Sequence, residues 1–272
     1  MLNLALALRQ SMQEEAVLVR VLSTGGSTPR GTDAWMLVFA DRQIGTIGGG
    51  NVEWHALSQA RKMLLALPVE NAGAVVVQRY ALGPSLGQCC GGEMHLAFHR
   101  ADPGDFETLE QQLRGASSHV AIFGGGHVGS ALARLLSELP VQVHWIDSRE
   151  SVLPSTLAPW ITCEHSEPAQ AAVAGLASPC HVLIMSHSHA EDLEILAACL
   201  VRQRVRADLP FIGLIGSKTK WASFRARLRS RGFEEDELDR VTCPIGIQGI
   251  NDKRPEVIAV SVAAQIMQIC TK

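Results

Sequence analysis

Two adjacent cysteines in a glycine-rich segment are the residues of this sequence with the clearest potential for chemistry. Cys89 and Cys90 directly precede Gly91 and Gly92, between two stretches with the composition of β-strands. Small neighbours leave these thiols open to a ligand, and metal ligation, thiolate chemistry and simple packing all fit. A permanent disulfide between neighbours in sequence would be strained. We expect a functional role for Cys90 and consider Cys89 a second candidate.

A glycine fingerprint in the second half of the chain predicts a turn that holds phosphate. Residues 124–129 read G-G-G-H-V-G, which fits G-x-G-x-x-G, and they lie between an expected strand and an expected helix. Gly124 would permit the tight turn, Gly126 would let a pyrophosphate reach the backbone, and Gly129 would let the helix pack on the strand. The start of the helix, at His127, would supply N–H donors for the anion.

An acidic residue ends the next expected strand, about 20 residues after the fingerprint. This residue, Asp147, would accept hydrogen bonds from a ribose, and Arg149 leaves a phosphorylated ribose open. The pattern therefore predicts a nucleotide site. The alternative is a loop that retains the fold and binds no nucleotide, because a fold does not fix a function.

A second glycine-rich turn lies in the first half of the chain, between an expected strand and an expected helix. Gly48, Gly49 and Gly50 offer backbone donors for an anion, and Asn51 is a plausible N-cap. Arg30 lies in the loop of a neighbouring strand and could add a charged fork for an oxyanion. The alternative is an ordinary turn, and the sequence does not decide whether the two loops meet in space.

A histidine-containing segment follows the strand expected at 181–185, at the edge of the sheet where α/β proteins bind ligands. Ser188 and Glu191 have the spacing of a capping box, which explains much of the segment structurally. Metal ligation by His187, His189 and Asp192 is less favoured, because no third ligand follows at a diagnostic spacing. His187 stays among the candidate binding residues.

Ser217 and Lys218 also lie where an expected strand gives way to a helix. Lysines at a helix N-terminus oppose the helix dipole, which makes better sense if an anion is bound there. The equally weighted alternative is a basic, solvated helix face that continues through Arg225 and Arg231. The segment does not have the Walker A pattern.

The elements that must position these residues fall into two groups. The first group contains an expected helix at 2–13, strands at 16–23, 35–39, 44–47, 74–82 and 94–98, and a helix at 52–67. The second contains strands at 119–123, 141–146, 181–185 and 211–215, with helices between them and a final apolar helix at 255–269. Because strands alternate with helices in the second group, we expect a parallel sheet there.

We therefore predict an α/β protein in which an N-terminal α+β domain precedes a C-terminal Rossmann-like parallel sheet. The boundaries are expected at 1–100 for the first domain, 101–117 for a linker and 118–272 for the second domain. The linker assignment depends on the turn at residues 102–104 and on the absence of a long apolar run.

Composition excludes several classes of protein. The 272 residues carry 24 Lys and Arg against 27 Asp and Glu, so the basic excess of a dedicated nucleic-acid binder is missing. No apolar run approaches the roughly 20 residues of a membrane span, and the start does not have the pattern of a signal peptide. The odd number of cysteines, seven, argues against a secreted disulfide framework and favours reduced thiols in a cytoplasm.

Taken together, the motifs resemble those of the XdhC/CoxI family over nearly the whole chain. The segments that carry this resemblance are residues 45–53, Cys90-Gly91-Gly92, and residues 124–129, 187–192, 213–218 and 244–247. The resemblance implies a cytoplasmic, homodimeric chaperone for the molybdenum cofactor. Such a protein binds the molybdopterin form while a cysteine desulfurase replaces an oxo ligand with sulfur, and then delivers it to apo xanthine dehydrogenase.

The resemblance also implies roles for individual residues. Cys90 matches the family's C-G-G position and would contact molybdenum, for which a thiolate is a suitable soft ligand. Arg30, Lys218 and the glycine loops would hold the phosphate of the pterin, or the Rossmann loop would bind a separate nucleotide. The competing function is an NAD(P)-dependent oxidoreductase with the cysteines as its redox centre, although no acid or base is placed by a motif. A purely structural adaptor would bind neither ligand.

Overall fold

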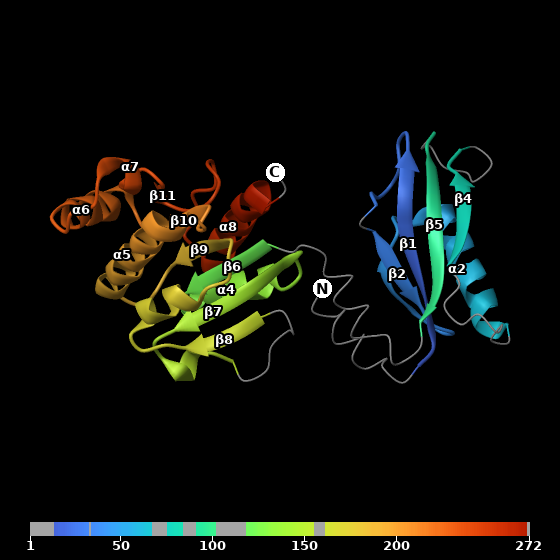
Figure 1. Cartoon of the computed structure of the whole chain (residues 1–272), viewed down its shortest axis with the longest axis horizontal. Coiled ribbons are helices and arrows are strands. Elements are labelled where there is room, and N and C mark those ends of the chain that lie inside the picture. The colour runs from blue at the N-terminus through green and yellow to red at the C-terminus, as the bar shows by residue number, and fades with distance from the viewer. Residues whose placement is uncertain are drawn as a thin grey trace. The chain divides into compact units, whose positions relative to one another are not determined.

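The computed structural model describes residues 14–32, 34–66, 75–83, 91–101, 118–154 and 161–270. The chain divides into two compact units, residues 3–115 and 116–272, and the division falls within the segment predicted as a linker (Figure 1). The helix expected at 2–13, the two adjacent cysteines and nearly all of the linker lie outside the described residues. No helix in the described ranges is long and apolar enough to cross a membrane.

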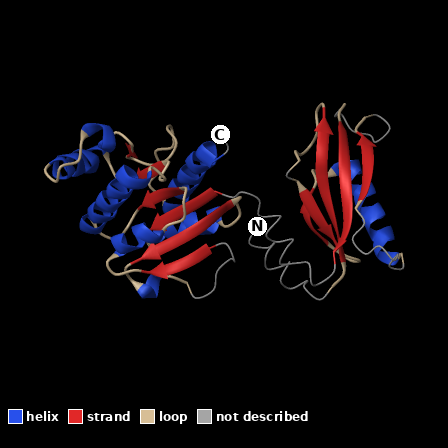
Figure 2. Ribbon diagram, in the orientation of Figure 1, coloured by secondary structure: helices blue, strands red, loops and turns tan. Residues whose placement is uncertain are grey.

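The N-terminal unit contains a five-stranded antiparallel sheet with one long helix packed on it (Figure 2). Its elements are β1 (Ala16–Gly25), β2 (Trp35–Val38), β3 (Gln43–Thr46), α2 (Gly50–Leu65), β4 (Val76–Ala81) and β5 (Glu93–Ala101), and the strand order is β3-β2-β1-β5-β4. Strand β2 pairs with β3 and β4 pairs with β5, both antiparallel, and all four lie at strands expected from the sequence.

Alternation along β1 explains why the helix covers one face of this sheet. Val17, Val19 and Val21 point to the same side and pack in one cluster with small residues spaced four apart on α2, Val52, Ala56 and Ala60. The intervening residues Ala16 and Leu18 belong to a second buried cluster on the opposite face. The apolar face of the strand, which repeats every two residues, therefore packs in a single core with the apolar face of the helix, which repeats about every 3.6 residues.

The C-terminal unit contains a six-stranded sheet whose neighbouring strands are all parallel. Its strands are β6 (Ser118–Phe123), β7 (Val141–Asp147), β8 (Ile161–His165), β9 (Cys180–Ile184), β10 (Phe211–Leu214) and β11 (Val241–Thr242), in the order β11-β10-β9-β6-β7-β8. Counted from β6, this is the 3-2-1-4-5-6 order of dinucleotide-binding folds. The predicted α/β fold class is confirmed.

Helices and short 3-10 turns connect these strands. They are α4 (His127–Leu136), η3 (Glu150–Val152), η4 (Ala169–Gly175), α5 (His189–Arg206), α6 (Lys218–Arg229), α7 (Glu235–Leu238) and α8 (Pro255–Cys270). Helix α4 ends at Leu136, shortly before Pro140, because the backbone preceding a proline disfavours the helical conformation. Three further elements, β8, β11 and α7, were not expected from the sequence, because they are short and only partly apolar.

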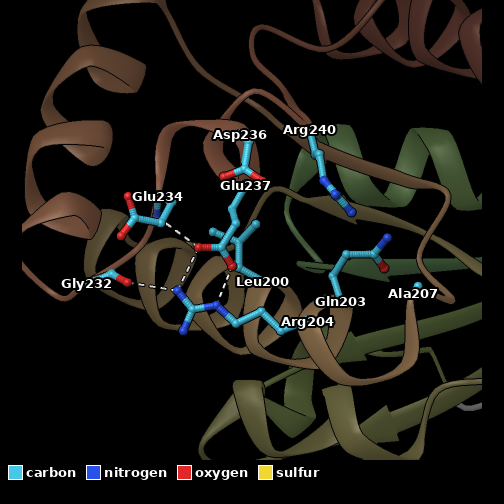
Figure 3. A pocket seen from close by; sticks show the side chains of 9 residues that line it. All are labelled: Leu200, Gln203, Arg204, Ala207, Gly232, Glu234, Asp236, Glu237 and Arg240. Atoms are coloured by element: carbon cyan, nitrogen blue, oxygen red, sulfur yellow. Dashed lines mark hydrogen bonds and ion pairs between the residues drawn. The ribbon is translucent and has the colours of Figure 1, made fainter.

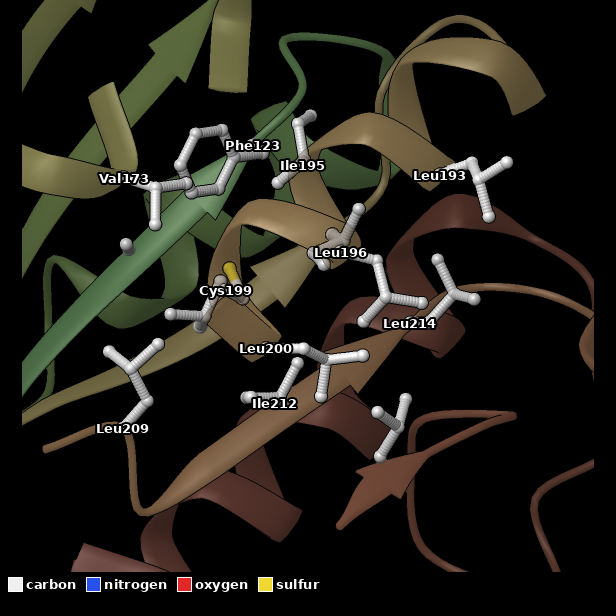
Figure 4. Close-up of a cluster of buried hydrophobic side chains, with 14 of the residues drawn as sticks. Phe123, Val173, Leu193, Ile195, Leu196, Cys199, Leu200, Leu209, Ile212 and Leu214 are labelled. Carbon is white, nitrogen blue, oxygen red and sulfur yellow. The ribbon is translucent and has the colours of Figure 1, made fainter. Parts of the chain in front are cut away.

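The main core of this unit lies between the sheet and α5. Phe123 and Ile184 from the sheet pack with Leu193, Leu196 and Leu200 of the helix, all fully or almost fully buried (Figure 4). Alternate residues of β6, Val120 and Ile122, are equally buried although they lie outside this cluster. Burial of successive residues explains why this strand is a continuous apolar run rather than an alternating one.

Candidate functional site

The end of the cysteine loop is packed tightly against the loop that follows β1. Cys89 and Cys90 themselves lie outside the described residues, but Gly91 and Gly92 are described. A Cβ on Gly92 would lie 2.5 Å from the carbonyl oxygen of Gly25 and would overlap that of Ser27. The carbonyl of Gly92 also accepts a hydrogen bond of 2.7 Å from the N–H of Leu82. Only glycine fits here, so the segment that directly follows Cys90 is fixed in place.

Arg30 lies at the meeting point of the two loops whose contact the sequence could not decide. A Cβ on Gly48 would come within 2.6 Å of Pro29 and 3.2 Å of Cγ of Arg30, and Gly48 has a φ of +121° that favours glycine. The Arg30 side chain is exposed. No carboxylate within the described ranges forms an ion pair with its guanidinium. Anion binding by this exposed guanidinium stays a prediction.

The structure argues against the predicted anion site on the Gly48–Gly50 turn, because the chain itself uses the N–H donors of Gly48 and Gly49. The carboxylate of Glu53 accepts hydrogen bonds from the N–H groups of Gly49 (3.0 Å) and Ile47 (3.1 Å). The N–H of Gly48 donates to the hydroxyl of Thr46, at 3.0 Å. The N-cap of α2 is Gly49 and not Asn51, which lies inside the helix. This turn is held by a carboxylate of the protein where we expected a bound phosphate.

Glu53 is charged because its hydrogen bonds outweigh its burial. Burial alone raises the pKa of this carboxyl, but donors from Thr46, Gly49, Gln43 and Ile47 together hold the pKa below its ordinary value. Two of these donors are side chains on β3, at 2.5 Å for Thr46 and 3.1 Å for Gln43. One residue of α2 therefore fixes the end of β3 and the turn that packs on Arg30.

The glycine fingerprint in the C-terminal unit has the predicted geometry. Gly124 has a φ of +126°, and a Cβ there would overlap the carbonyl oxygen of Met185 at the end of β9. A Cβ on Gly129 would overlap the carbonyl oxygen of Gly124, so close helix-to-strand packing is confirmed. Gly126 is the exposed N-cap of α4, and no atom lies within 4 Å of a Cβ built on it. His127, which begins α4, is also exposed; phosphate binding at these two residues stays a prediction.

Asp147 is not presented to a ligand as the sequence analysis expected. Its side chain is almost completely buried and accepts the N–H of Gly125 at 2.5 Å. The Arg149 guanidinium donates to both carboxylate oxygens at 2.9 Å. Burial raises the pKa of Asp147, but the hydrogen bonds from Arg149 and Gly125 outweigh it and hold the pKa below its ordinary value. The structure gives Asp147 the role of closing the glycine loop.

The histidine-containing segment begins α5 as its capping pattern predicted. Ser188 is the N-cap and accepts the N–H of Glu191 at 3.1 Å. The Glu191 carboxylate pairs with Nδ1 of His187 at 3.2 Å, so the reciprocal half of a capping box is not formed. No group of three or more potential metal ligands occurs in the described part of the chain.

A buried ion pair joins the starts of α5 and α6, and the sequence analysis did not find it. The ammonium of Lys220 lies 2.6 Å from Asp192 and donates to the carbonyl of Ile215 at 2.8 Å. Asp192 also accepts the N–H of Ser186, and therefore it is engaged with the protein rather than with a metal. Ser217 caps α6 by accepting the N–H of Lys220, whereas Lys218 is exposed. Nothing in the sequence distinguishes the inward lysine from its neighbour.

A cavity of about 550 Å³ lies between α5 and α7 in the C-terminal unit (Figure 3). It is lined by Leu200, Gln203, Arg204, Ala207, Gly232, Glu234, Asp236, Glu237 and Arg240. Its central arginine, Arg204, is already paired with the carboxylate of Glu237 at 2.7 Å and with the carbonyl of Gly232 at 2.8 Å. None of the candidate residues from the sequence lines this cavity.

Comparison with known proteins agrees with the two-unit organisation. Residues 120–266 match the XdhC Rossmann domain, and residues 10–69 match the XdhC and CoxI family. The first match alone spans more than half of the chain, and the protein therefore belongs to the XdhC and CoxI family.

One related sequence and one solved structure resemble this chain over most of its length. The uncharacterized protein YqeB of Escherichia coli (strain K12) is 28% identical over 254 residues, which cover 93% of this chain and 43% of that protein. This chain therefore spans less than half the length of that curated relative. A crystal structure described as a xanthine dehydrogenase from Bacillus halodurans has a TM-score of 0.75 at 20% identity, covering 98% of this chain and 95% of that one. That likeness shows a common fold.

The packing of Gly92 predicts a sharp difference between two adjacent glycines. We expect Gly92→Ala to lower the free energy of unfolding by about 1–3 kcal/mol, because its methyl group would overlap the Ser27 carbonyl. Gly91→Ala is the matched control, since no atom lies within 4 Å of a Cβ there. Urea denaturation of both variants measures the difference, and equal stability would contradict the packing.

The carboxylate of Glu53 predicts a pH-dependent contribution to stability. Because its pKa is lower in the folded protein, the stabilisation is complete above the ordinary value of 4.5 and is lost as the pH falls through the folded-state pKa. We expect Glu53→Gln to cost about 1–3 kcal/mol at neutral pH and progressively less in acid. Glu256→Gln, at an exposed glutamate in the first turn of α8, is the control. Denaturation at several pH values measures the loss of stability in Glu53→Gln. A loss that stays constant with pH would refute the prediction.

Proposed function

We propose that this protein is an accessory protein of xanthine dehydrogenase that binds and transfers the molybdenum cofactor without turnover. Membership of the XdhC and CoxI family supports the accessory role. The crystal structure with the same fold is described as a xanthine dehydrogenase, which agrees with an association with that enzyme. The cargo in this proposal is the molybdopterin form of the cofactor.

The observation that carries the proposal is the fixed end of the cysteine loop. Gly92 is packed on Gly25, the last residue of β1, and on Ser27, in the loop that leads to Arg30. The segment with the adjacent thiols therefore ends at this contact, and the loop that carries Arg30 begins at it. No carboxylate within the described ranges forms an ion pair with the guanidinium of Arg30. A thiol and a guanidinium are two of the chemical groups that a pterin phosphate with a dithiolene-bound metal requires.

The residues fit the cargo by the chemistry of their donors. A thiolate is a soft ligand suited to molybdenum, and we assign Cys90 to this contact with Cys89 as a second thiol. Arg30 can hold phosphate oxygens through two parallel hydrogen bonds. The C-terminal unit offers its own anion donors at Gly126 and His127, at the N-terminus of α4, and an exposed lysine at Lys218.

A carrier protein must also be able to release its cargo. A carrier must bind tightly enough to protect its cargo and weakly enough to pass it on, which favours one thiolate contact over a closed metal cage. While the cofactor is held, a cysteine desulfurase replaces an oxo ligand with sulfur. The product is then delivered to apo xanthine dehydrogenase. We propose that the protein acts as a homodimer in the cytoplasm.

The second candidate is an NAD(P)-dependent oxidoreductase with a cysteine redox centre. The observation in its favour is the 3-2-1-4-5-6 strand order with a glycine loop after the first strand. The two functions differ in their ligand, because the carrier retains a pterin and the oxidoreductase retains a dinucleotide.

Cofactor loading tests the carrier proposal directly. We expect the wild-type protein, incubated with molybdenum cofactor, to retain nearly stoichiometric molybdenum and pterin. Cys90→Ala should weaken binding on the order of tenfold or more, and Cys89→Ala tests the second thiol in parallel. Cys270→Ala, at the end of α8, is the control cysteine. Absence of pterin from the wild type, or unchanged binding by Cys90→Ala, would contradict the proposal.

A further inference from the structure

The carboxylate at the ribose position of the glycine loop points into the protein. In dinucleotide-binding folds the acidic residue after the second strand accepts the ribose hydroxyls, and here that residue is Asp147, at the end of β7. We infer that Asp147, Arg149 and Val152 close the ribose subsite, so that the C-terminal unit excludes NAD⁺ and NADP⁺. This inference does not depend on the carrier proposal, and it opposes the second candidate, the NAD(P)-dependent oxidoreductase.

Every acceptor position of Asp147 is in use. One carboxylate oxygen accepts the backbone N–H of Arg149 at 2.8 Å and its Nε at 2.9 Å. The other accepts the N–H of Gly125 at 2.5 Å and Nη2 of Arg149 at 2.9 Å. A carboxylate has about four lone-pair positions, so these bonds leave none for a ribose hydroxyl. The residue is also only 2% exposed.

The same ion pair removes the usual means of recognising a phosphorylated ribose. An arginine near this position can accommodate the 2′-phosphate of NADP⁺. In this protein Nε and Nη2 of Arg149, which form one edge of the fork, are both donated to Asp147. Hydrogen bonding to Asp147, with a smaller effect of the charge of Glu191, raises the pKa of Arg149. Glu191 would also repel an incoming phosphate.

A hydrocarbon side chain closes the remaining side of the subsite. Val152 ends the 3-10 turn η3, and its Cγ2 lies 2.6 Å from the position of a Cβ on Gly125. The methyl group therefore lies directly against the loop on the side of Asp147, where the same Cβ position is 3.2 Å from the carboxylate. The closure is local, because Gly126, the next residue, is open.

Calorimetric titration of the full chain with NAD⁺ and NADP⁺ tests the inference. We expect no binding of either ligand to the wild type at about 1 mM. Arg149→Met frees one acceptor position on each oxygen of Asp147, and adding Val152→Ala removes the methyl groups. These variants should gain NAD⁺ affinity by at least about tenfold and should favour NAD⁺ over NADP⁺, because the freed carboxylate repels a 2′-phosphate.

Arg254→Met is the matched control. Arg254 makes the same bonds to Asp252, two residues before it, with the backbone N–H at 2.8 Å and Nη2 at 2.6 Å, but on an exposed surface. We expect the Arg254→Met protein, like the wild type, to bind neither dinucleotide. Wild-type binding of either dinucleotide well below 1 mM would overturn the exclusion, whether or not any variant folds. Folded Arg149→Met and Arg149→Met/Val152→Ala proteins without a gain would overturn the assignment to these residues.

Discussion

The close approach of Gly92 to the backbone of Gly25 and Ser27 is the contact on which the proposed site depends. No residue with a side chain fits between these carbonyls. The contact joins the segment after Cys90 to the loop after β1, and that loop continues to Pro29 and Arg30, which pack on Gly48. Three glycine-containing segments, far apart in the sequence, therefore define one region of the N-terminal unit. The glycines that follow Cys90 and the loop that carries Arg30 are both fixed in this region by packing.

A carboxylate of the protein holds each of these two glycine turns, half-buried at Glu53 and fully buried at Asp147. Glu53 accepts the backbone donors of the turn before α2, and Asp147 accepts the N–H of Gly125 in the turn before α4. A glycine-rich turn exposes N–H groups that must be satisfied, and an internal carboxylate can satisfy them as well as a bound phosphate can. This explains why, in two turns whose sequences are typical of anion sites, backbone donors bind a carboxylate of the protein. The groups that we propose for an external anion are therefore Gly126 in one turn and Arg30 beside the other.

The sequence predicted the sheets and the local role of glycines better than it predicted the directions of charged side chains. The buried strands of the parallel sheet, the cap at Ser188 and the packing of Gly129 follow from periodicity and local sterics. The inward turn of Asp147 depends on Arg149 and Gly125, and the burial of Lys220 depends on Asp192 from another helix. Such partners are fixed by tertiary packing, so a local pattern cannot identify them. The same holds for Glu53, which resembles any glutamate in a first helical turn.

The central claim of this account is that the thiolate of Cys90 contacts the metal of a bound molybdenum cofactor. X-ray absorption at the molybdenum edge, on the loaded protein, measures the metal's ligands without depending on turnover. The account predicts a sulfur ligand in addition to those of the dithiolene, present in the wild type and absent from residual loaded Cys90→Ala. Identical molybdenum coordination in the two proteins would contradict it.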